Sequence, residues 1–219
     1  TLHVDSKVEK VYKIVQKTTG ALGGNGSTGA IYGELTTRAL QRVYNIMVDK
    51  CNLTSASRMI DVGAGLGKPS FHAAQDPAVR LSLGAELEDI RWILSMHNLD
   101  RFLDHVEDDI NTHASSSSDV PAPVAATKPK KAGKGSKTKA ATTDPFTHIY
   151  MFDLGFPPPL QKSIAKKFNN SVHAECLVSY RPPRRVIHEY GYAVTFVDQV
   201  LCSMHGSGEG HTAYIYMRS

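Results

Sequence analysis

The first fifty residues show two helical patterns on either side of a glycine-rich segment. Apolar side chains recur every three or four residues over 4–17 and again over 37–51, which predicts two amphipathic helices. Five glycines fall within residues 20–29, which predicts a loop. We therefore interpret residues 1–57 as an N-terminal helical segment that carries a glycine-rich loop.

Beyond residue 57, short apolar runs alternate with helical patterns. Four runs predict buried strands, at residues 59–62, 81–86, 148–153 and 174–180. A weaker run, predicted as the third strand in chain order, ends at Asp108–Ile110. Residues 192–200 and 213–217 alternate like a hairpin pair. Strands that alternate with helices and end in an antiparallel pair predict a three-layer α/β domain over residues 58–219.

Residues 114–143 interrupt this pattern. They are rich in Ser, then Pro and Ala, then Lys and Gly, and they contain no aromatic residue, Leu, Ile or Met. Because such a segment cannot supply a hydrophobic core, we expect a disordered insertion. Six lysines and one aspartate give it a net charge of +5, so the rest of a chain of net charge +4 carries −1. The basic character is therefore concentrated in Lys128–Lys139.

Composition narrows the possible classes of protein. The chain has 219 residues, enough for one hydrophobic core. Three cysteines, an odd number without metal-ligand spacing, predict free thiols in a reducing compartment and no metal site. No apolar run approaches the length of a membrane span and no signal peptide is visible, so we expect no membrane partner.

Three glycines follow the first predicted strand at alternate positions. Gly63, Gly65 and Gly67 form G-x-G-x-G after Asp61, and Pro69 suits the first turn of a helix. Glycine allows a tight turn or a close approach to a ligand, and a helix N-terminus attracts anions. The dinucleotide fingerprint G-x-G-x-x-G and the phosphate-loop G-K-[ST] are both missing. The motif predicts a nucleotide-like ligand; the alternative is a glycine-rich turn without one.

Two acids further along the chain could contact such a ligand. Glu86 ends the second predicted strand, 25 residues after Asp61, near the position where comparable units bind ribose hydroxyls. A carboxylate suits ribose because it accepts two hydrogen bonds side by side. Asp109, at the end of the weak third strand, could accept from an adenine amino group. The alternative for each is an acid exposed at a strand end or in a solvated turn.

Several signatures together resemble one enzyme family. The stretch from Asp61 to Gly67 resembles the first motif of class I S-adenosylmethionine (SAM) methyltransferases. The other signatures are Tyr32-Gly33-Glu34, Phe152-Asp153 followed by Phe156, and Leu177–Pro182. Over roughly residues 28–218, the chain resembles the non-SET histone lysine methyltransferases of the disruptor-of-telomeric-silencing type. This resemblance implies the class I SAM methyltransferase fold, three α/β/α layers with a mostly parallel seven-stranded sheet that ends in an antiparallel hairpin.

The resemblance implies SAM as the cofactor and S-adenosylhomocysteine as the product. Glu86 would then bind the ribose. Lys68, at the helix start, would meet the methionine carboxylate; the alternative is a solvated lysine without a role. The segment Tyr32-Gly33-Glu34 would close over the methionine end. The complete set of cofactor-binding residues that we expect is Tyr32, Gly33, Glu34, Thr36, Asp61, Gly63, Gly65, Gly67, Lys68, Glu86, Asp109 and Ile110.

The resemblance also implies a substrate, a lysine in the core of histone H3 on the nucleosome, and a nuclear location. Phe156 and Tyr214 are candidates for an aromatic channel around that lysine, and Asp153 for contact with the entering amine or the cofactor. Packing in the core is the alternative for both aromatic residues. Lys128–Lys139 would bind DNA phosphates in a salt-dependent manner; a soluble linker or a nuclear-import signal is the alternative.

Departures from the family pattern indicate a divergent branch, such as its small kinetoplastid members. Lys68 stands where the family has Gln, and Ile110 stands where it has an adenine-stacking Phe. The turn after residues 148–153 is one residue shorter than in the family. Two other classes stay open: a SAM methyltransferase that acts on RNA, another protein or a small molecule, and a non-catalytic binding module with the same fold.

Overall fold

The computed structural model describes residues 2–19, 34–114, 141–205 and 208–219, with side chains omitted over 107–114. The predicted glycine-rich loop, Tyr32 and Gly33, and nearly all of the predicted insertion lie outside these residues.

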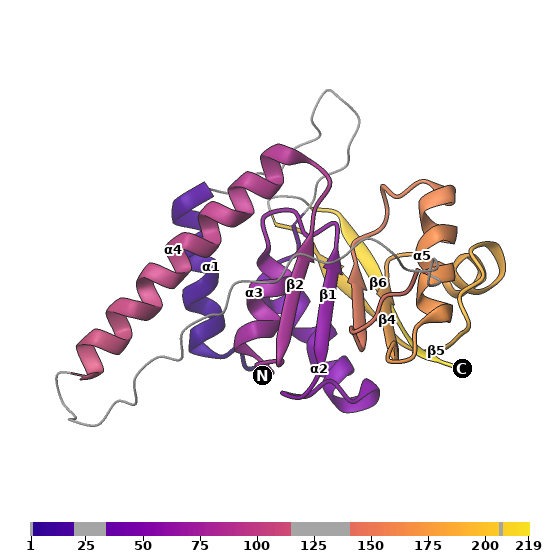
Figure 1. Cartoon of the computed structure of the whole chain (residues 1–219), viewed down its shortest axis with the longest axis horizontal. Coiled ribbons are helices and arrows are strands. Elements are labelled where there is room, and N and C mark those ends of the chain that lie inside the picture. The colour runs from indigo at the N-terminus through magenta and orange to yellow at the C-terminus, as the bar shows by residue number, and fades with distance from the viewer. Residues whose placement is uncertain (1, 20–33, 115–140, 206–207) are drawn as a thin grey trace, which may run out of the picture.

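The described strands form one six-stranded sheet in the order β2-β1-β3-β4-β6-β5 (Figure 1). Four strands run parallel: β1 Arg58–Val62, β2 Leu81–Ala85, β3 His148–Met151 and β4 Cys176–Ser179. The two last strands, β5 Val194–Ser203 and β6 Gly210–Arg218, form the predicted antiparallel hairpin, and β6 also pairs with β4. The mixed α/β sheet is therefore confirmed, with six strands instead of seven.

Helices cover both faces of this sheet. The N-terminal helices and those after β1 and β2 are α1 Ser6–Thr19, α2 Thr37–Cys51, α3 Lys68–Gln75 and α4 Asp89–Ala114. The later helical segments are α5 Pro158–Asn170 and the π-helical turn η1 Arg184–Glu189. Within the part of the chain that the structure describes, none of the helices combines the length and the apolar character that a membrane span requires.

Two hydrophobic clusters hold the layers together. The strands alternate between them: Tyr150 of β3 faces the cluster under α2 and α3, whereas Ile149 and Met151 face the one under α5 and η1. α2 begins where predicted because the Thr36 hydroxyl accepts a hydrogen bond from the Ala39 amide at 3.2 Å, an N-cap.

The predicted strand ending at Asp108–Ile110 is wrong. These residues continue α4, which runs to Ala114. The physical reason is visible in the spacing, since Leu103, Val106 and Ile110 recur at helical intervals and do not alternate. Among the described strands, β2 therefore lies at the edge of the sheet.

We predict that Phe168→Ala lowers the free energy of unfolding by about 3–5 kcal/mol, because a wholly buried ring of α5 leaves a cavity in the second cluster. Urea denaturation measures this change. Lys167→Ala, an exposed neighbour on the same helix, should change it by less than about 0.5 kcal/mol. Equal stabilities for the two variants would contradict the assignment of α5 to the core.

Candidate functional site

The glycine motif forms a tight turn between β1 and α3. Gly63, Gly65 and Gly67 have φ values of 83°, 55° and 87°, in the left-handed region that favours glycine. A Cβ on Gly63 would lie 3.0 Å from the Phe156 ring, so the close approach of this ring also requires glycine. The Ala85 carbonyl accepts from the amides of Gly63 and Ala64, at 2.7 and 3.0 Å, which fastens the turn to the end of β2.

A cavity of about 740 Å³ lies at the carboxyl ends of the parallel strands. This is where open α/β sheets bind their ligands. The predicted residues that line it are Glu34, Asp61, Gly63, Gly65, Lys68, Glu86 and Phe156. The structure therefore brings together residues from the N-terminal segment, the glycine turn, the end of β2 and the turn after β3.

Glu86 is held by donors on both of its carboxylate oxygens. Oε2 accepts from the Gly65 amide at 2.8 Å. Oε1 accepts from the amides of Leu87 and Glu88, at 3.0 and 2.9 Å, and from the Arg91 guanidinium at 3.2 Å. Burial by itself would raise the pKa of Glu86, but these hydrogen bonds and the Arg91 charge outweigh it and lower the pKa. The carboxylate is thus an ionised, oriented acceptor at the cavity wall.

Asp61 is the second acid at the centre of the cavity. Its side chain is almost wholly buried, and Oδ2 has no hydrogen-bond partner among the described residues. Burial, and next the charge of Glu86, raise the pKa of Asp61 well above its usual value. A buried carboxylate oxygen without a donor is costly, so this position favours a ligand that brings an N–H or O–H group.

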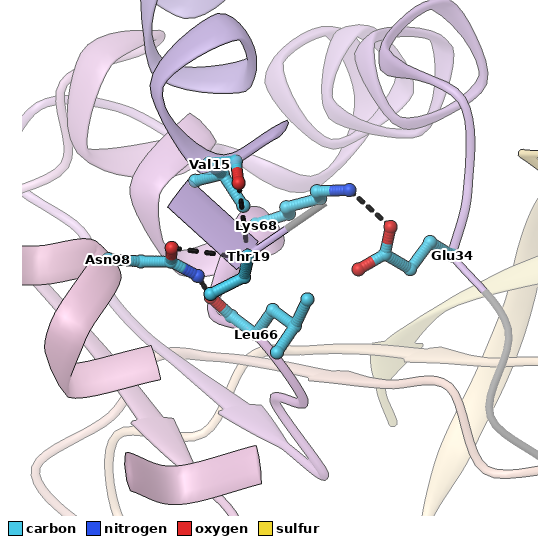
Figure 2. A network of polar contacts seen from close by, with 6 residues as sticks. All are labelled: Val15, Thr19, Glu34, Leu66, Lys68 and Asn98. Atoms are coloured by element: carbon cyan, nitrogen blue, oxygen red, sulfur yellow. Dashed lines mark hydrogen bonds and ion pairs between the residues drawn. The ribbon is translucent and has the colours of Figure 1, made fainter. Parts of the chain in front are cut away.

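Lys68 and Glu34 form an ion pair within the cavity (Figure 2). Both side chains are nearly buried, with 11% and 7% exposed. The Glu34 carbonyl accepts from the His205 amide at 2.7 Å, and Leu35 forms an isolated antiparallel bridge with Met204. The residues before α2 are thereby attached to the hairpin end of β5, and the charged pair closes one side of the cavity.

Two helices support the glycine turn from behind (Figure 2). The Asn98 side-chain amide of α4 donates to the Leu66 carbonyl at 3.2 Å. The Thr19 hydroxyl of α1 lies 3.3 Å from Asn98 Oδ1 and 3.1 Å from the Val15 carbonyl. Asn98 is wholly buried, so these bonds fix the turn in a place that water does not reach. Sequence patterns did not indicate this network.

Tyr12 of α1 is a cavity residue that sequence reasoning placed only in an amphipathic helix. Its hydroxyl lies 3.3 Å from His72 Nδ1, and His72 Nε2 lies 2.9 Å from Gln41 Oε1. Because Gln41 Oε1 can only accept, Nε2 carries the proton and the Tyr12 hydroxyl donates to Nδ1. Burial lowers the pKa of His72 to about 3, so the ring is neutral and positions Tyr12.

Aromatic side chains gather at the end of β3. Phe152 and Tyr150 line the cavity together with Phe156. Phe152 packs on Tyr180 with ring centroids 4.6 Å apart, and on His211 at 5.7 Å. This wall was only partly predicted, since Phe152 belonged to the family signature but was not assigned a role.

Four predicted site residues do not line the cavity. Asp153 is wholly buried and accepts from Gln161 Nε2, Ser179 Oγ and the Tyr180 amide, at 2.7, 2.6 and 2.7 Å. These bonds connect the ends of β3 and β4, which is a structural role. The other three are Thr36, the N-cap of α2; Gly67, the N-cap of α3; and Tyr214, which packs on Phe196.

Asp109 and Ile110 lie in α4 and not at a strand end, and their side chains are not described. Among the described residues, no group of three or more His, Cys, Asp or Glu side chains could hold a metal ion.

The chain resembles known proteins in sequence over part of its length and in fold over nearly all of it. The family "Histone methylation protein DOT1" matches residues 24–108. No curated protein matches the sequence significantly. A candidate RNA methyltransferase from Pyrococcus horikoshii is 12% identical, with a TM-score of 0.55 over 98% of this chain and 99% of that one.

The fold is that of the class I SAM-dependent methyltransferases. Magnesium protoporphyrin IX methyltransferase from Synechocystis PCC 6803, solved with bound SAM, is 13% identical and covers all of both chains at a TM-score of 0.45. The tRNA methyltransferase TrmK of B. subtilis is 12% identical over 86% of this chain and 68% of its own, at 0.49. Together, the family match and the fold support a SAM-dependent methyltransferase.

We predict that Glu86→Ala weakens the binding of S-adenosylhomocysteine by about 1–3 kcal/mol, the usual cost of losing hydrogen bonds to a charged acceptor. Isothermal titration calorimetry measures this loss. Asp89→Ala, which removes an exposed acid three residues later, is the matched control and should bind almost as the parent does. If both variants bind alike, Glu86 only braces the glycine turn.

Proposed function

We propose that this protein transfers methyl groups from SAM to a lysine side chain in the core of histone H3 on nucleosomes. The observation that carries the proposal is the oriented Glu86 carboxylate on the Gly65 amide, within a cavity at the ends of β1 and β2. The DOT1 family match over residues 24–108 supports the histone substrate, and it contains both Glu86 and the glycine motif.

The cavity offers complementary groups to each part of the cofactor. Glu86 accepts from the ribose hydroxyls while keeping its bond to Gly65. Asp61 Oδ2, which has no donor among the described residues, takes the α-ammonium group. Lys68 takes the carboxylate and exchanges its present partner Glu34 for it. With its carboxylate on Lys68 and its ammonium group on Asp61, the zwitterionic end of the cofactor pairs both of these buried charges.

The chemistry of the step requires a neutral amine. SAM carries its methyl group on a sulfonium, and the neutral thioether that remains after transfer is a good leaving group. The protein therefore has to position and desolvate the lysine. Phe152 and Phe156 provide an apolar wall, which disfavours the charged ammonium and lowers the pKa of a lysine between them. The same rings stabilise a methylated ammonium product. Asp153 and Tyr214 lie outside the cavity, and we propose no chemical step for either.

The nucleosome as partner and the nucleus as location follow from the family resemblance. The six lysines within Lys128–Lys139 give a physical reason for DNA binding, because each lysine that meets a phosphate releases counterions. Since no aromatic residue lies among them, stacking on bases is not expected. Lys68 and Ile110, which differ from the family pattern, support a divergent branch such as the kinetoplastid one.

We predict methyl transfer to nucleosomal histone H3 when radiolabelled SAM is incubated with nucleosomes, free histones and RNA in parallel. Phe156→Ala should lower the rate at least about tenfold, equivalent to about 1.4 kcal/mol, and leave the affinity for S-adenosylhomocysteine within about threefold. Phe146→Ala, at the opposite end of β3, is the control. Label on RNA and not on histone would refute the histone substrate and favour the RNA alternative.

We predict that replacing the six lysines of Lys128–Lys139 by glutamine weakens nucleosome binding and leaves the affinity for S-adenosylhomocysteine unchanged. The log–log dependence of nucleosome affinity on salt should become shallower by about 0.9 for each phosphate that no longer meets a lysine. Binding curves at several salt concentrations measure the slope. An unchanged slope would show that the tract does not bind DNA.

A further inference from the structure

Among the described strands, β2 has a hydrogen-bonded neighbour on one side only. It is the first strand in the sheet order and pairs in parallel with β1 (Figure 1). In the described parts of the chain, no strand pairs with its other edge. That edge therefore presents N–H and C=O groups to an incoming strand. Its sequence, Leu-Ser-Leu-Gly-Ala, has none of the charges, prolines or bulges that usually protect an edge strand.

The side chains of β2 differ strongly between the two faces of the sheet. Ser82 Oγ donates to the Ser70 carbonyl of α3 at 2.8 Å, and a Cβ on Gly84 would meet Ser70 and Ala64. Because strand residues alternate, Leu81 and Leu83 point to the opposite face. They are 40% and 46% exposed, so two leucines lie next to this edge with no covering layer from the described residues.

α4, which follows β2, is also apolar on its outer side. Asn98 is wholly buried and marks the side of the helix that faces the glycine turn and α1. The exposed apolar side chains on the other side of the helix are Trp92, Ile93, Met96 and Leu103. Leu87, in the turn before α4, and Ile90, in its first turn, are 89% and 73% exposed.

The composition of residues 115–140 argues against this segment as the cover of the exposed apolar side chains. The charges of β2 and α4 favour a partner of balanced charge. Residues 115–140 contain no Leu, Ile, Met or aromatic residue, a composition that does not favour burial of apolar surface. β2 has no charge, and residues 89–104 carry three aspartates and two arginines. This balance neither selects a strongly charged partner nor repels a second copy.

We propose that two copies of this chain pair through β2 as antiparallel strands, joining both sheets across a twofold axis. In an antiparallel pair of two β2 strands, the side chains that lie opposite each other are complementary in size. With Leu83 on the axis, Leu81 lies opposite Ala85 of the second copy, and Ser82 lies opposite Gly84. Each larger side chain thus faces a smaller one, and the two Leu83 side chains meet on the face away from α3.

The available area suits a concentration-dependent dimer. Eight exposed apolar side chains on β2, α4 and the turn between them present on the order of several hundred Å², the size of patch that marks interaction sites. Stable interfaces bury about 800 Å² per partner, somewhat over half of it apolar, so this one falls near the low end. Because Ala85 to Glu88 line the cavity, the paired strand of the second copy also borders it.

The pairing can be tested by sedimentation velocity over a wide range of protein concentration. The parent should change from monomer to dimer, and Leu83→Lys should raise the dimer dissociation constant at least about tenfold, because two like charges would meet on the axis. Val172→Lys, in an 81% exposed position after α5, should dimerise like the parent. A parent that stays monomeric, or equal dimerisation of Leu83→Lys, would overturn the proposal.

A second variant keeps the test valid if Leu83→Lys does not fold. Leu83→Cys should form a disulfide between two copies under mild oxidation, since residues directly opposite in antiparallel strands have Cβ atoms within about 4.5–5.5 Å. The native cysteines, Cys51, Cys176 and Cys202, are buried and give little background. Val172→Cys is the matched control. Equal cross-linking of Leu83→Cys and Val172→Cys would also refute pairing through β2.

Discussion

The carboxylate of Glu86 is the contact on which the geometry of the cavity depends. It holds the Gly65 amide on one oxygen and the Leu87 and Glu88 amides, with Arg91, on the other. These bonds join the turn after β1 to the turn after β2 and to the first turn of α4. Since the donors keep the carboxylate ionised and oriented before any ligand arrives, binding loses less conformational entropy than it would with a mobile acid.

The N-terminal helix is an integral part of this arrangement. Tyr12 reaches the cavity wall, and Thr19 supports the amide of Asn98 beneath the glycine turn. His72, kept neutral by burial, connects α1 to α2 through Tyr12 and Gln41. Described residues from both parts of the chain that differ in sequence pattern, 1–57 and 58–219, therefore line one cavity.

Local sequence patterns predicted most of the fold because the period and length of the apolar runs determine where those helices and strands form. α2 covers the residues expected from its apolar period, and the strand before the glycine turn follows from its short apolar run. The error at Asp108–Ile110 arose because a weakly apolar segment was interpreted as a strand although its spacing is helical. Without a strand there, the sheet formed by the described residues has six strands, with β2 at its edge.

The site was predictable only where motif spacing carries the information. Glu86 and the glycine turn were found by their separation, which the βαβ geometry constrains. The placement of Tyr12 and Asn98 depends on the packing of α1 against α3 and α4, and no local pattern reports that packing. Asp153 shows the converse, since this acid after a buried strand bonds the ends of two strands and does not line the cavity.

The burial of Asp61 makes ligand binding in the cavity dependent on pH. A low-dielectric position next to Glu86 raises the pKa of this carboxyl, so the free protein binds a proton there more readily than an exposed acid would. A cationic group that arrives at Oδ2 favours the ionised form and lowers the pKa again. Binding of such a ligand therefore releases a proton wherever the free carboxyl is protonated, and affinity rises with pH across that interval.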